Sequence, residues 1–253
     1  MNTKNSTNIK DILKNHSHNT ILTADSMLKK GFSRELQRSA VRSGWLTRIS
    51  NGAYTVLGEE VSLEGALYTL QKELGLSVHQ AGYTALDEKY GKTHNLTLER
   101  KAQLFCYRNE KLPAWFCSTY HSQYELFVTS FLPKDMGFTN YDTGNFTIRI
   151  PTIERAILEM VYLTPSVHTL QETYQVLELL NTAKPALVQS LLEHCCSIKV
   201  KRLFLYMAEQ AGLAWIKHID IQKIDLGSGD REITKGGQYN KKYRIVIENV
   251  EAI

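Results

Sequence analysis

The sequence contains no apolar run approaching the roughly 20 residues that a membrane-spanning helix requires. Residues 1–15 are too polar for a secretory signal, so we expect a cytoplasmic protein with no membrane partner. Cysteine is scarce, and no C-x-x-C pair occurs among Cys106, Cys117, Cys195 and Cys196. This usage is typical of reduced thiols and argues against the common zinc motifs, so we expect no metal ligands.

The sequence also lacks the motifs of common catalytic and nucleotide-binding sites. G-x-S-x-G and G-x-x-x-x-G-K-[ST] are absent, and G-x-G-x-x-G fails because Glu232 takes the place of the last glycine. Asp220 and Asp225 flank Lys223 without the spacing of a metal-dependent nuclease. The glycines of 226–237 either cradle a phosphate or form turns between late strands, and we favour turns. We therefore expect no catalytic residue and no cofactor.

The composition that is present describes a soluble globular protein. Its 253 residues are 43% hydrophobic and 22% charged, which is enough chain for two domains or one large domain with a sizeable core. The net charge is +4. Residues 1–60 hold nine Lys or Arg against five Asp or Glu, and the rest of the chain holds 21 of each. The whole basic excess therefore lies in the first quarter, where it favours a polyanionic partner.

Capping residues and apolar spacing predict three short helices in this basic segment. Apolar spacing predicts a helix over 7–15. Thr23 as N-cap and Gly31 as C-cap bound a second helix, and Ser33 begins a third that Gly44 ends. Two helices joined by a tight glycine-containing turn form a helix-turn-helix.

The third helix separates apolar from basic residues. At about 100° per residue, Leu36 and Ala40 fall on one side. The other side carries a basic stripe flanked by Gln37, namely Arg34, Arg38 and Arg42. A recognition helix presents such a stripe to the major groove. The alternative is a solvated helix face whose charges are balanced elsewhere in the fold.

An alternating pattern follows Gly44. The runs 45–49 and 53–56 predict two strands, and Asn51-Gly52 supplies the hairpin turn. Three helices and a hairpin are the order of a winged helix-turn-helix. Arg48 would then lie on the wing, within reach of phosphates or a narrow minor groove.

The chain beyond residue 60 predicts a mixed domain. Helices are expected at 62–75, 79–91, 153–163, 173–183, 186–195 and 200–212, and strands at 94–99, 102–107, 124–130, 146–150 and the carboxyl end. We expect an α+β fold, in which a winged helix-turn-helix over 1–60 precedes a larger mixed α/β C-terminal domain over 61–253. The boundary can lie as late as residue 95. A candidate antitoxicity site or second basic surface comprises Lys199, Lys201, Arg202, Arg231, Lys235, Lys241, Lys242 and Arg244.

Six stretches together resemble a known family. They are residues 22–56, AGYTAL (81–86), LPAWF (112–116), TIERAILEM (152–160), KVKRLFLYMAEQAGLAW (199–215) and IDLGSGDREITKGGQYNKKYRI (224–245). The chain resembles the AbiEi antitoxins of type IV, abortive-infection toxin–antitoxin systems. The first stretch is shared by many winged-helix regulators, whereas the last two are much more specific.

The resemblance implies a non-enzymatic repressor of its own toxin–antitoxin operon. Such a protein is a monomer in solution and binds double-stranded DNA cooperatively, at promoter inverted repeats, through its N-terminal domain. The family uses the C-terminal domain against a nucleotidyltransferase-like toxin, without a stable direct complex. Two departures matter: Thr152-Ile153 replaces Ser-Pro before ERAIL, and Ser50-Asn51 stands where a basic residue is common.

Three readings of function remain after the resemblance. In the first, the DNA-binding residues are Lys29, Lys30, Ser33, Arg34, Gln37, Arg38, Arg42, Arg48 and Asn51. Within that set Arg34, Gln37 and Arg38 would meet base edges, because Arg can pair bidentately with guanine and Gln with adenine. The alternative is a DNA-targeted enzyme whose C-terminal domain binds a nucleotide or phosphodiester. A blander alternative makes the winged helix a protein-interaction module.

Overall fold

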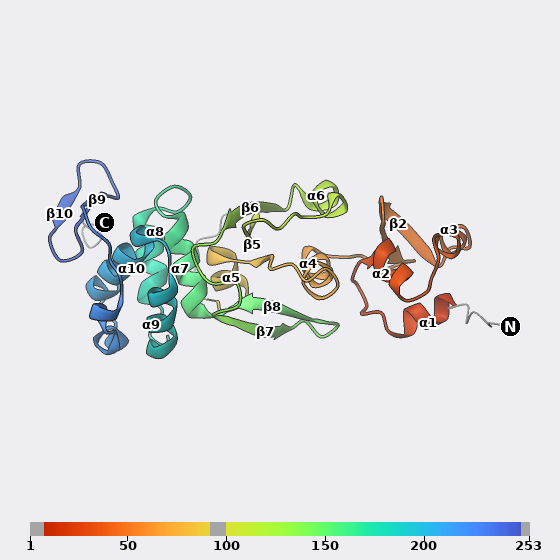
Figure 1. The fold of residues 1–253 in the computed structure, drawn as a ribbon, viewed down its shortest axis with the longest axis horizontal. Helices are drawn as coiled ribbons and strands as arrows, with labels where there is room; N and C mark the ends of the chain where they lie inside the picture. The colour runs from red at the N-terminus through yellow and green to blue at the C-terminus, as the bar shows by residue number, and fades with distance from the viewer. Residues whose placement is uncertain (1–7, 92–99, 249–253) are drawn as a thin grey trace. The chain divides into compact units, whose positions relative to one another are not determined.

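The computed structural model describes residues 8–91 and 100–248, which form two compact units (Figure 1). Unit 1 consists of residues 1–79, 109–126 and 140–149, and unit 2 of 80–108, 127–139 and 150–253. Both units contain helices and strands, which confirms the expected mixture of α and β structure. The strand expected at 94–99 lies outside the described residues.

Unit 1 begins with the helices and hairpin that the sequence predicts. The helices are α1 (Ile9–Lys14), α2 (Ala24–Lys29) and α3 (Arg34–Arg42), followed by strands β2 (Leu46–Ser50) and β3 (Ala53–Val56). A short strand, β1 (Leu22–Thr23), completes an antiparallel sheet in the order β1-β3-β2. The Thr23 hydroxyl accepts from the Ser26 N–H at 3.1 Å and the Ser33 hydroxyl from the Leu36 N–H at 3.3 Å, so both expected N-caps are confirmed.

A small apolar core holds these elements together. Its buried members are Ile12, Leu22, Met27, Phe32, Ala40 and Leu46. They come from each helix, from the turn between α2 and α3 and from strands β1 and β2, so the amphipathic spacing of the sequence is satisfied within this segment.

The next helix, α4 (Leu63–Lys72), packs against the loop before β1. The buried Thr69 hydroxyl accepts the Ile21 N–H and lies within hydrogen-bond distance of the Ile21 carbonyl, at 3.1 Å each. A Cβ added to Gly65 would lie 2.0 Å from the Asn19 carbonyl oxygen, so only glycine fits there. Leu63, Ala66, Leu67 and Leu70 are buried, so α4 directs one apolar face to the interior.

The helix α6 (Ala114–Tyr120) was not predicted, because its sequence lies in a region that reads as strands. AWFCSTY is rich in aromatic residues, which locally favour strands. Burial decides the conformation, since Trp115, Phe116 and Tyr120 all face the interior. The Tyr120 hydroxyl also donates to the Val61 carbonyl at 3.0 Å.

Three of the four strands expected between 94 and 150 are present, and one is added. β4 (His79–Gln80), β5 (Ala102–Tyr107) and β6 (Tyr124–Thr129) form a three-stranded sheet in that order. β7 (Phe138–Asp142), which was not expected, pairs with β8 (Thr147–Pro151).

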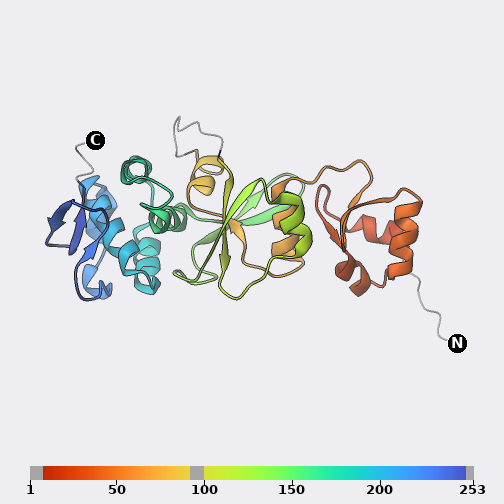
Figure 2. The same ribbon diagram turned by 90° about the horizontal axis from the view of Figure 1, so that it is seen from above.

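Unit 2 is dominated by helices (Figure 2). They are α5 (Gly82–Glu88), α7 (Ile153–Leu163), α8 (Leu170–Glu178), α9 (Pro185–His194) and α10 (Ile198–Gln210). Their apolar faces form the largest core, and α7 and α10 are buried over most of their length. Inside it, Arg155 and Glu159 form an ion pair of 2.7 Å, and the Gly82 N–H donates to the same carboxylate at 3.3 Å.

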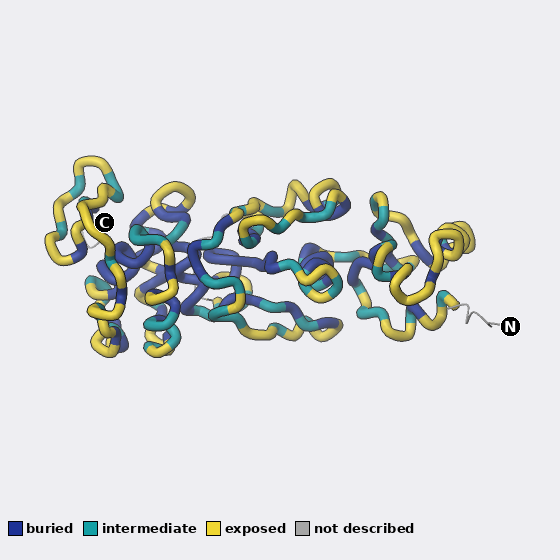
Figure 3. The backbone as a smooth tube through the Cα atoms, viewed as in Figure 1, coloured by how far each residue is buried: buried dark blue, intermediate teal, exposed yellow. Residues whose placement is uncertain are grey.

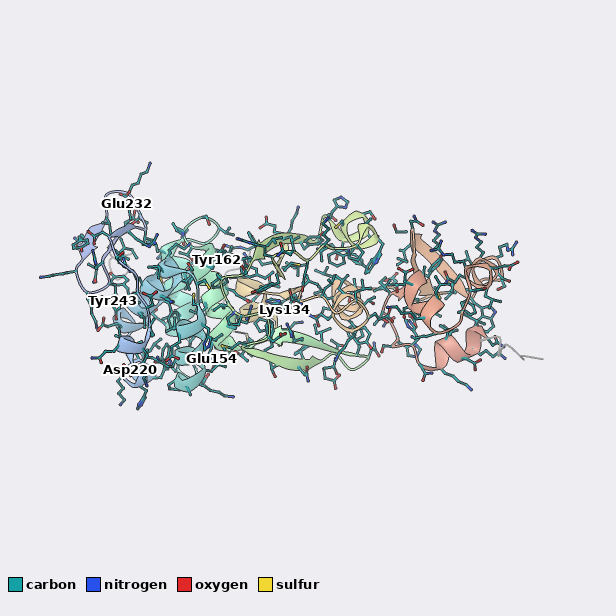
Figure 4. All side chains as sticks on the ribbon, in the orientation of Figure 1. Lys134, Glu154, Tyr162, Asp220, Glu232 and Tyr243 are labelled. Atoms are coloured by element: carbon teal, nitrogen blue, oxygen red, sulfur yellow. The ribbon has the colours of Figure 1, made fainter. Side chains whose placement is uncertain are left out.

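The last described part of unit 2 is a small sheet, which follows two 3-10 turns in the chain. The turns are η1 (Ala214–His218) and η2 (Ile221–Lys223), and the strands β9 (Arg231–Glu232), β10 (Gln238–Asn240) and β11 (Ile245–Ile247) lie in the order β10-β11-β9. Tyr243, labelled with Glu232 in Figure 4, is buried before β11. Burial raises the pKa of its hydroxyl. Within the described residues, no helix is long and apolar enough to span a bilayer.

The four cysteines divide into two accessibility classes, which gives a labelling prediction. Cys117 and Cys196 are exposed, whereas Cys106 and Cys195 are buried. Burial raises the pKa of the Cys195 thiol to about 11, so little reactive thiolate forms near neutral pH. Iodoacetamide at pH 8 should therefore alkylate Cys117 and Cys196 in the native protein. Mass spectrometry should find Cys106 and Cys195 modified only after denaturation, and rapid native labelling of Cys195 would contradict this packing.

Candidate nucleic-acid interface

The helix α3 exposes its basic residues and buries the opposite side. Figure 3 shows most of α3 as exposed, in contrast to α7. Arg34, Arg38 and Arg42 are all exposed. Within residues 8–91 and 100–248, none of these three guanidinium groups forms an ion pair or a side-chain hydrogen bond. Their charges are therefore not neutralised by the fold, unlike those of a balanced solvated face.

Gln37 does not lie in this exposed stripe, which corrects the prediction that it reads bases. Its side chain is 1% exposed, and its Nε2 donates to the carbonyls of Ala24 and Phe32, at 3.0 Å each. The amide thus ties α3 to α2 and sets the rotation of α3. Leu36, expected to face inward, is consequently 36% exposed, whereas Ala40 is buried as expected.

The contacts of Gln37 predict a stability effect rather than a change of base preference. Gln37→Ala should lower the free energy of unfolding by about 1–3 kcal/mol, because two neighbouring carbonyls lose their donor. Thermal melting should detect the loss, with Ser39→Ala on the exposed face of α3 as the matched control. An unchanged melting temperature together with an altered preferred sequence would restore the base-reading role.

The hairpin holds Arg48 close to its turn. The Arg48 Nε donates to the Ser50 carbonyl at 3.3 Å, and Nη2 donates to the Asn51 side-chain oxygen at 2.9 Å. Both acceptors are neutral, so the positive charge of Arg48 is retained at the tip. A register shift in β2 between Arg48 and Ser50 accompanies this arrangement. Asn51 is exposed beside it.

Three further residues of the predicted interface lie beside α3. Lys29 and Lys30 are exposed at the end of α2, and both favour the charged form of the Glu73 carboxyl. Burial nevertheless dominates and raises the pKa of Glu73. Ser33 has its hydroxyl oxygen engaged as the N-cap of α3. Lys29 and Lys30 are therefore exposed to solvent and also stabilise the charged form of a carboxyl group in the same unit.

Arg34, Arg38 and Arg48 border a hollow of about 530 Å³ within unit 1, which we call the arginine cleft. Its polar lining includes Asp25, Arg34, Gln37, Arg38, Arg48 and Asn51. Tyr54 and Leu74 contribute apolar surface, and so do Pro113, Ala114 and Trp115 at the start of α6. The structure therefore brings both predicted base-reading arginines and the hairpin arginine to one site. The residues at the start of α6 carry no charge and no phosphate-binding motif, so nothing in the sequence indicates that they line the arginine cleft.

The prediction of a second basic surface is wrong for two of its members, because these two are interior residues. Lys201 and Arg202 are 3% and 1% exposed. The Arg202 guanidinium donates to the carbonyls of Leu226, Gly227, Gly229 and Arg244 at 2.7–3.1 Å. Lys201 donates to the Asp225 carbonyl at 2.9 Å. Both side chains hold the glycine-rich segment onto α10.

Other members of that set are also occupied. The Lys199 ammonium donates to the carbonyls of Tyr162 and Thr164, and burial lowers its pKa. Lys242 pairs with Glu209. Arg244 pairs with Asp230 at 3.0 Å, and this contact lowers the pKa of the Asp230 carboxyl. Arg231, Lys235 and Lys241 remain exposed, and their part in antitoxicity stays a prediction.

The glycine-rich segment 226–237 is built differently from a phosphate cradle. A cradle presents backbone N–H groups to an anion, whereas carbonyls of this segment are directed at Arg202. Among the residues that the structure describes, no group of three His, Cys, Asp or Glu is placed to hold a metal ion.

Comparison with known families accounts for nearly the whole chain. Residues 5–98 match the model described as the N-terminal domain of the AbiEi antitoxin transcriptional regulator. Residues 99–248 match the model described as the transcriptional regulator AbiEi antitoxin of a type IV toxin–antitoxin system. The chain belongs to the AbiEi antitoxin family. The resemblance drawn from the sequence is confirmed, and this AbiEi-family protein is a transcriptional regulator with a larger C-terminal domain.

A comparison with curated proteins finds no match. Among solved structures, the AbiEi-family chain is similar to the crystal structure of the RV2827C protein from Mycobacterium tuberculosis. The TM-score is 0.59 at 13% sequence identity, covering 92% of this chain and 87% of that one. At this identity the likeness concerns the fold alone.

Proposed function

We propose that this AbiEi-family regulator represses its own toxin–antitoxin operon by binding inverted repeats in the promoter. In this proposal α2 and α3 act as a helix-turn-helix, and the β2–β3 hairpin is the wing. One observation carries it: the exposed face of α3 presents three arginines that no acidic residue of the described chain neutralises. Unpaired positive charge on an exposed helix contributes little to the stability of the fold, but it attracts the phosphates of duplex DNA.

The three arginines are assigned different roles by their position on α3. Arg34 and Arg38 line the arginine cleft near the amino end of the helix, where recognition helices contact base edges. Either can pair bidentately with guanine. Arg42 at the last turn, with Lys29 on α2 and Arg48 on the wing, is assigned to phosphates. Because the sites are inverted repeats, two copies bind one promoter cooperatively.

Binding to the promoter should respond to salt in a way that counts phosphate contacts. Fluorescence anisotropy would compare the duplex upstream of the operon with a scrambled duplex at several salt concentrations. Lys29→Ala should weaken both duplexes alike and flatten the slope of log K against log salt by about one unit. Lys217→Ala, an exposed lysine of unit 2, is the control and should leave the slope unchanged. Equal or absent binding of both duplexes by the unmodified protein would refute the proposal.

A further inference from the structure

The arginine cleft has two chemically different parts. Arg34, Arg38 and Arg48 supply three guanidinium groups, and Asp25 is the one carboxylate of its described lining. A second part is uncharged and comes from outside the helix-turn-helix, at the start of α6. The cleft is therefore strongly cationic on one part and apolar on another.

The α6 part is a fixed component of unit 1. The Ser118 hydroxyl on α6 lies 3.4 Å from the Ser50 hydroxyl at the end of β2. Trp115, Phe116 and Tyr120 anchor α6 in the interior, and the Tyr120 hydroxyl donates to a backbone carbonyl before α4. The uncharged part of the cleft is thus held beside the wing by contacts independent of the arginines.

A sugar–phosphate strand has the same division of chemistry. Its phosphates are anionic, and its deoxyribose rings present apolar carbon surface between them. The volume of about 530 Å³ greatly exceeds the roughly 30 Å³ that one water molecule occupies, so the cleft accommodates more than a single anion. An acidic peptide would need a particular alternation of acidic and apolar side chains to match both parts, whereas every DNA strand carries this alternation in its backbone.

We propose that the arginine cleft receives one sugar–phosphate strand of duplex DNA, with Pro113 and Ala114 at the start of α6 against the deoxyribose rings. This inference rests on the proposed function, and it adds a DNA contact from the part of the chain that lies beyond the N-terminal family domain. The recognition unit then comprises α3, the wing and α6. A phosphate of the strand lies on Arg48, whereas Arg34 and Arg38 reach past the strand to the base edges, and α6 sets the path of the strand past the wing.

Ala114 allows a direct test, because it lines the cleft and is exposed. Ala114→Lys adds a cation beside the strand, and Ala114→Glu adds an anion. We expect Ala114→Lys to bind the promoter duplex more tightly and with a slope steeper by about one unit. Its advantage over the unmodified protein should shrink roughly three- to fourfold between 50 and 200 mM salt, as one added phosphate contact requires. Ala114→Glu should weaken binding of the promoter duplex by about the same factor by which Ala114→Lys tightens it.

The matched controls separate this inference from general charge effects and from stability. Ser122→Lys and Ser122→Glu place the same charges on an exposed residue after α6 that does not line the cleft, and they should change affinity much less. The dipole of α6 makes Glu more favourable than Lys at its first turn, so Ala114→Glu should be the more stable of the two variants. DNA affinity is expected to rank them the other way, so a change of stability cannot be mistaken for the effect on DNA binding.

Each outcome decides the question. If the unmodified protein binds the promoter but the Ala114 variants match the Ser122 variants, the α6 contact is wrong and the proposed function stands. If the Ala114 variants alter binding of single-stranded DNA or mononucleotides but not of the duplex, the assignment to duplex DNA is wrong. If the unmodified protein does not discriminate the promoter duplex, the proposed function itself falls.

Discussion

Arg38→Ala is expected to weaken binding to the promoter duplex by about 1–3 kcal/mol, roughly 5- to 150-fold, and to relax the preference at one base pair. The side chain is exposed and has no partner to lose within the described residues, so the thermal stability should not change. The affinity loss then reports a contact with DNA rather than a damaged fold. Anisotropy titrations with promoter and scrambled duplexes would measure it.

Two companion variants assign the role of Arg38 more sharply. Arg38→Lys keeps the charge but cannot pair bidentately, so it should retain the salt dependence and lose base preference. Arg42→Ala should weaken promoter and scrambled duplexes alike, because a phosphate contact carries no sequence information. Unchanged promoter affinity of Arg38→Ala would mean that α3 does not enter the groove in the proposed orientation.

Arg202→Met is expected to destabilise unit 2 by about 3 kcal/mol, because the carbonyls of four residues lose a charged donor. Methionine fills much of the volume without replacing any of these hydrogen bonds. The damage should be local, since the acceptors lie at 226–229 and 244. Denaturant unfolding would measure the free energy, and hydrogen exchange should show the amides of 226–245 losing protection.

Substitution of exposed Arg231 by Met provides the comparison for Arg202. It should change stability by less than about 0.5 kcal/mol, because its side chain has no such carbonyl partners in the described structure. Arg202→Lys keeps a donor but reaches fewer carbonyls, so it should fall between the two. Normal stability of Arg202→Met accompanied by loss of antitoxin activity in a growth assay would return Arg202 to a functional surface.

The elements of the N-terminal segment were predictable because their signals are local. Thr23 and Ser33 cap the helices that follow them within three residues, and Gly44 ends α3 with a φ of +74°. Asn51-Gly52 likewise marks a turn between two adjacent strands. Each signal is read from a few neighbouring residues, and no distant contact overrides it.

The errors in the predicted sites concern polar residues whose partners are distant in sequence. Gln37 bonds a carbonyl 13 residues away, and Arg202 bonds carbonyls 24 or more residues away. The partners are backbone carbonyls, which every residue carries, so the sequence does not indicate them. From residue type alone, Gln37 and Arg202 are therefore expected at the surface. One signal was available for Arg202: the six residues that follow it in α10, Leu203 to Ala208, are apolar on every side of the helix. A helix buried all round must bury its charged residues too.

The contacts of α4 determine how short a folded amino-terminal fragment can be. A fragment that stops at residue 60 would lose the hydrogen bonds between the Thr69 hydroxyl and the Ile21 backbone. It would also lose the close packing of Gly65 against the Asn19 carbonyl. Extending the fragment through Lys72 keeps both contacts inside one piece. Limited proteolysis that releases a stable amino-terminal piece should therefore cut after α4, not in the loop before it.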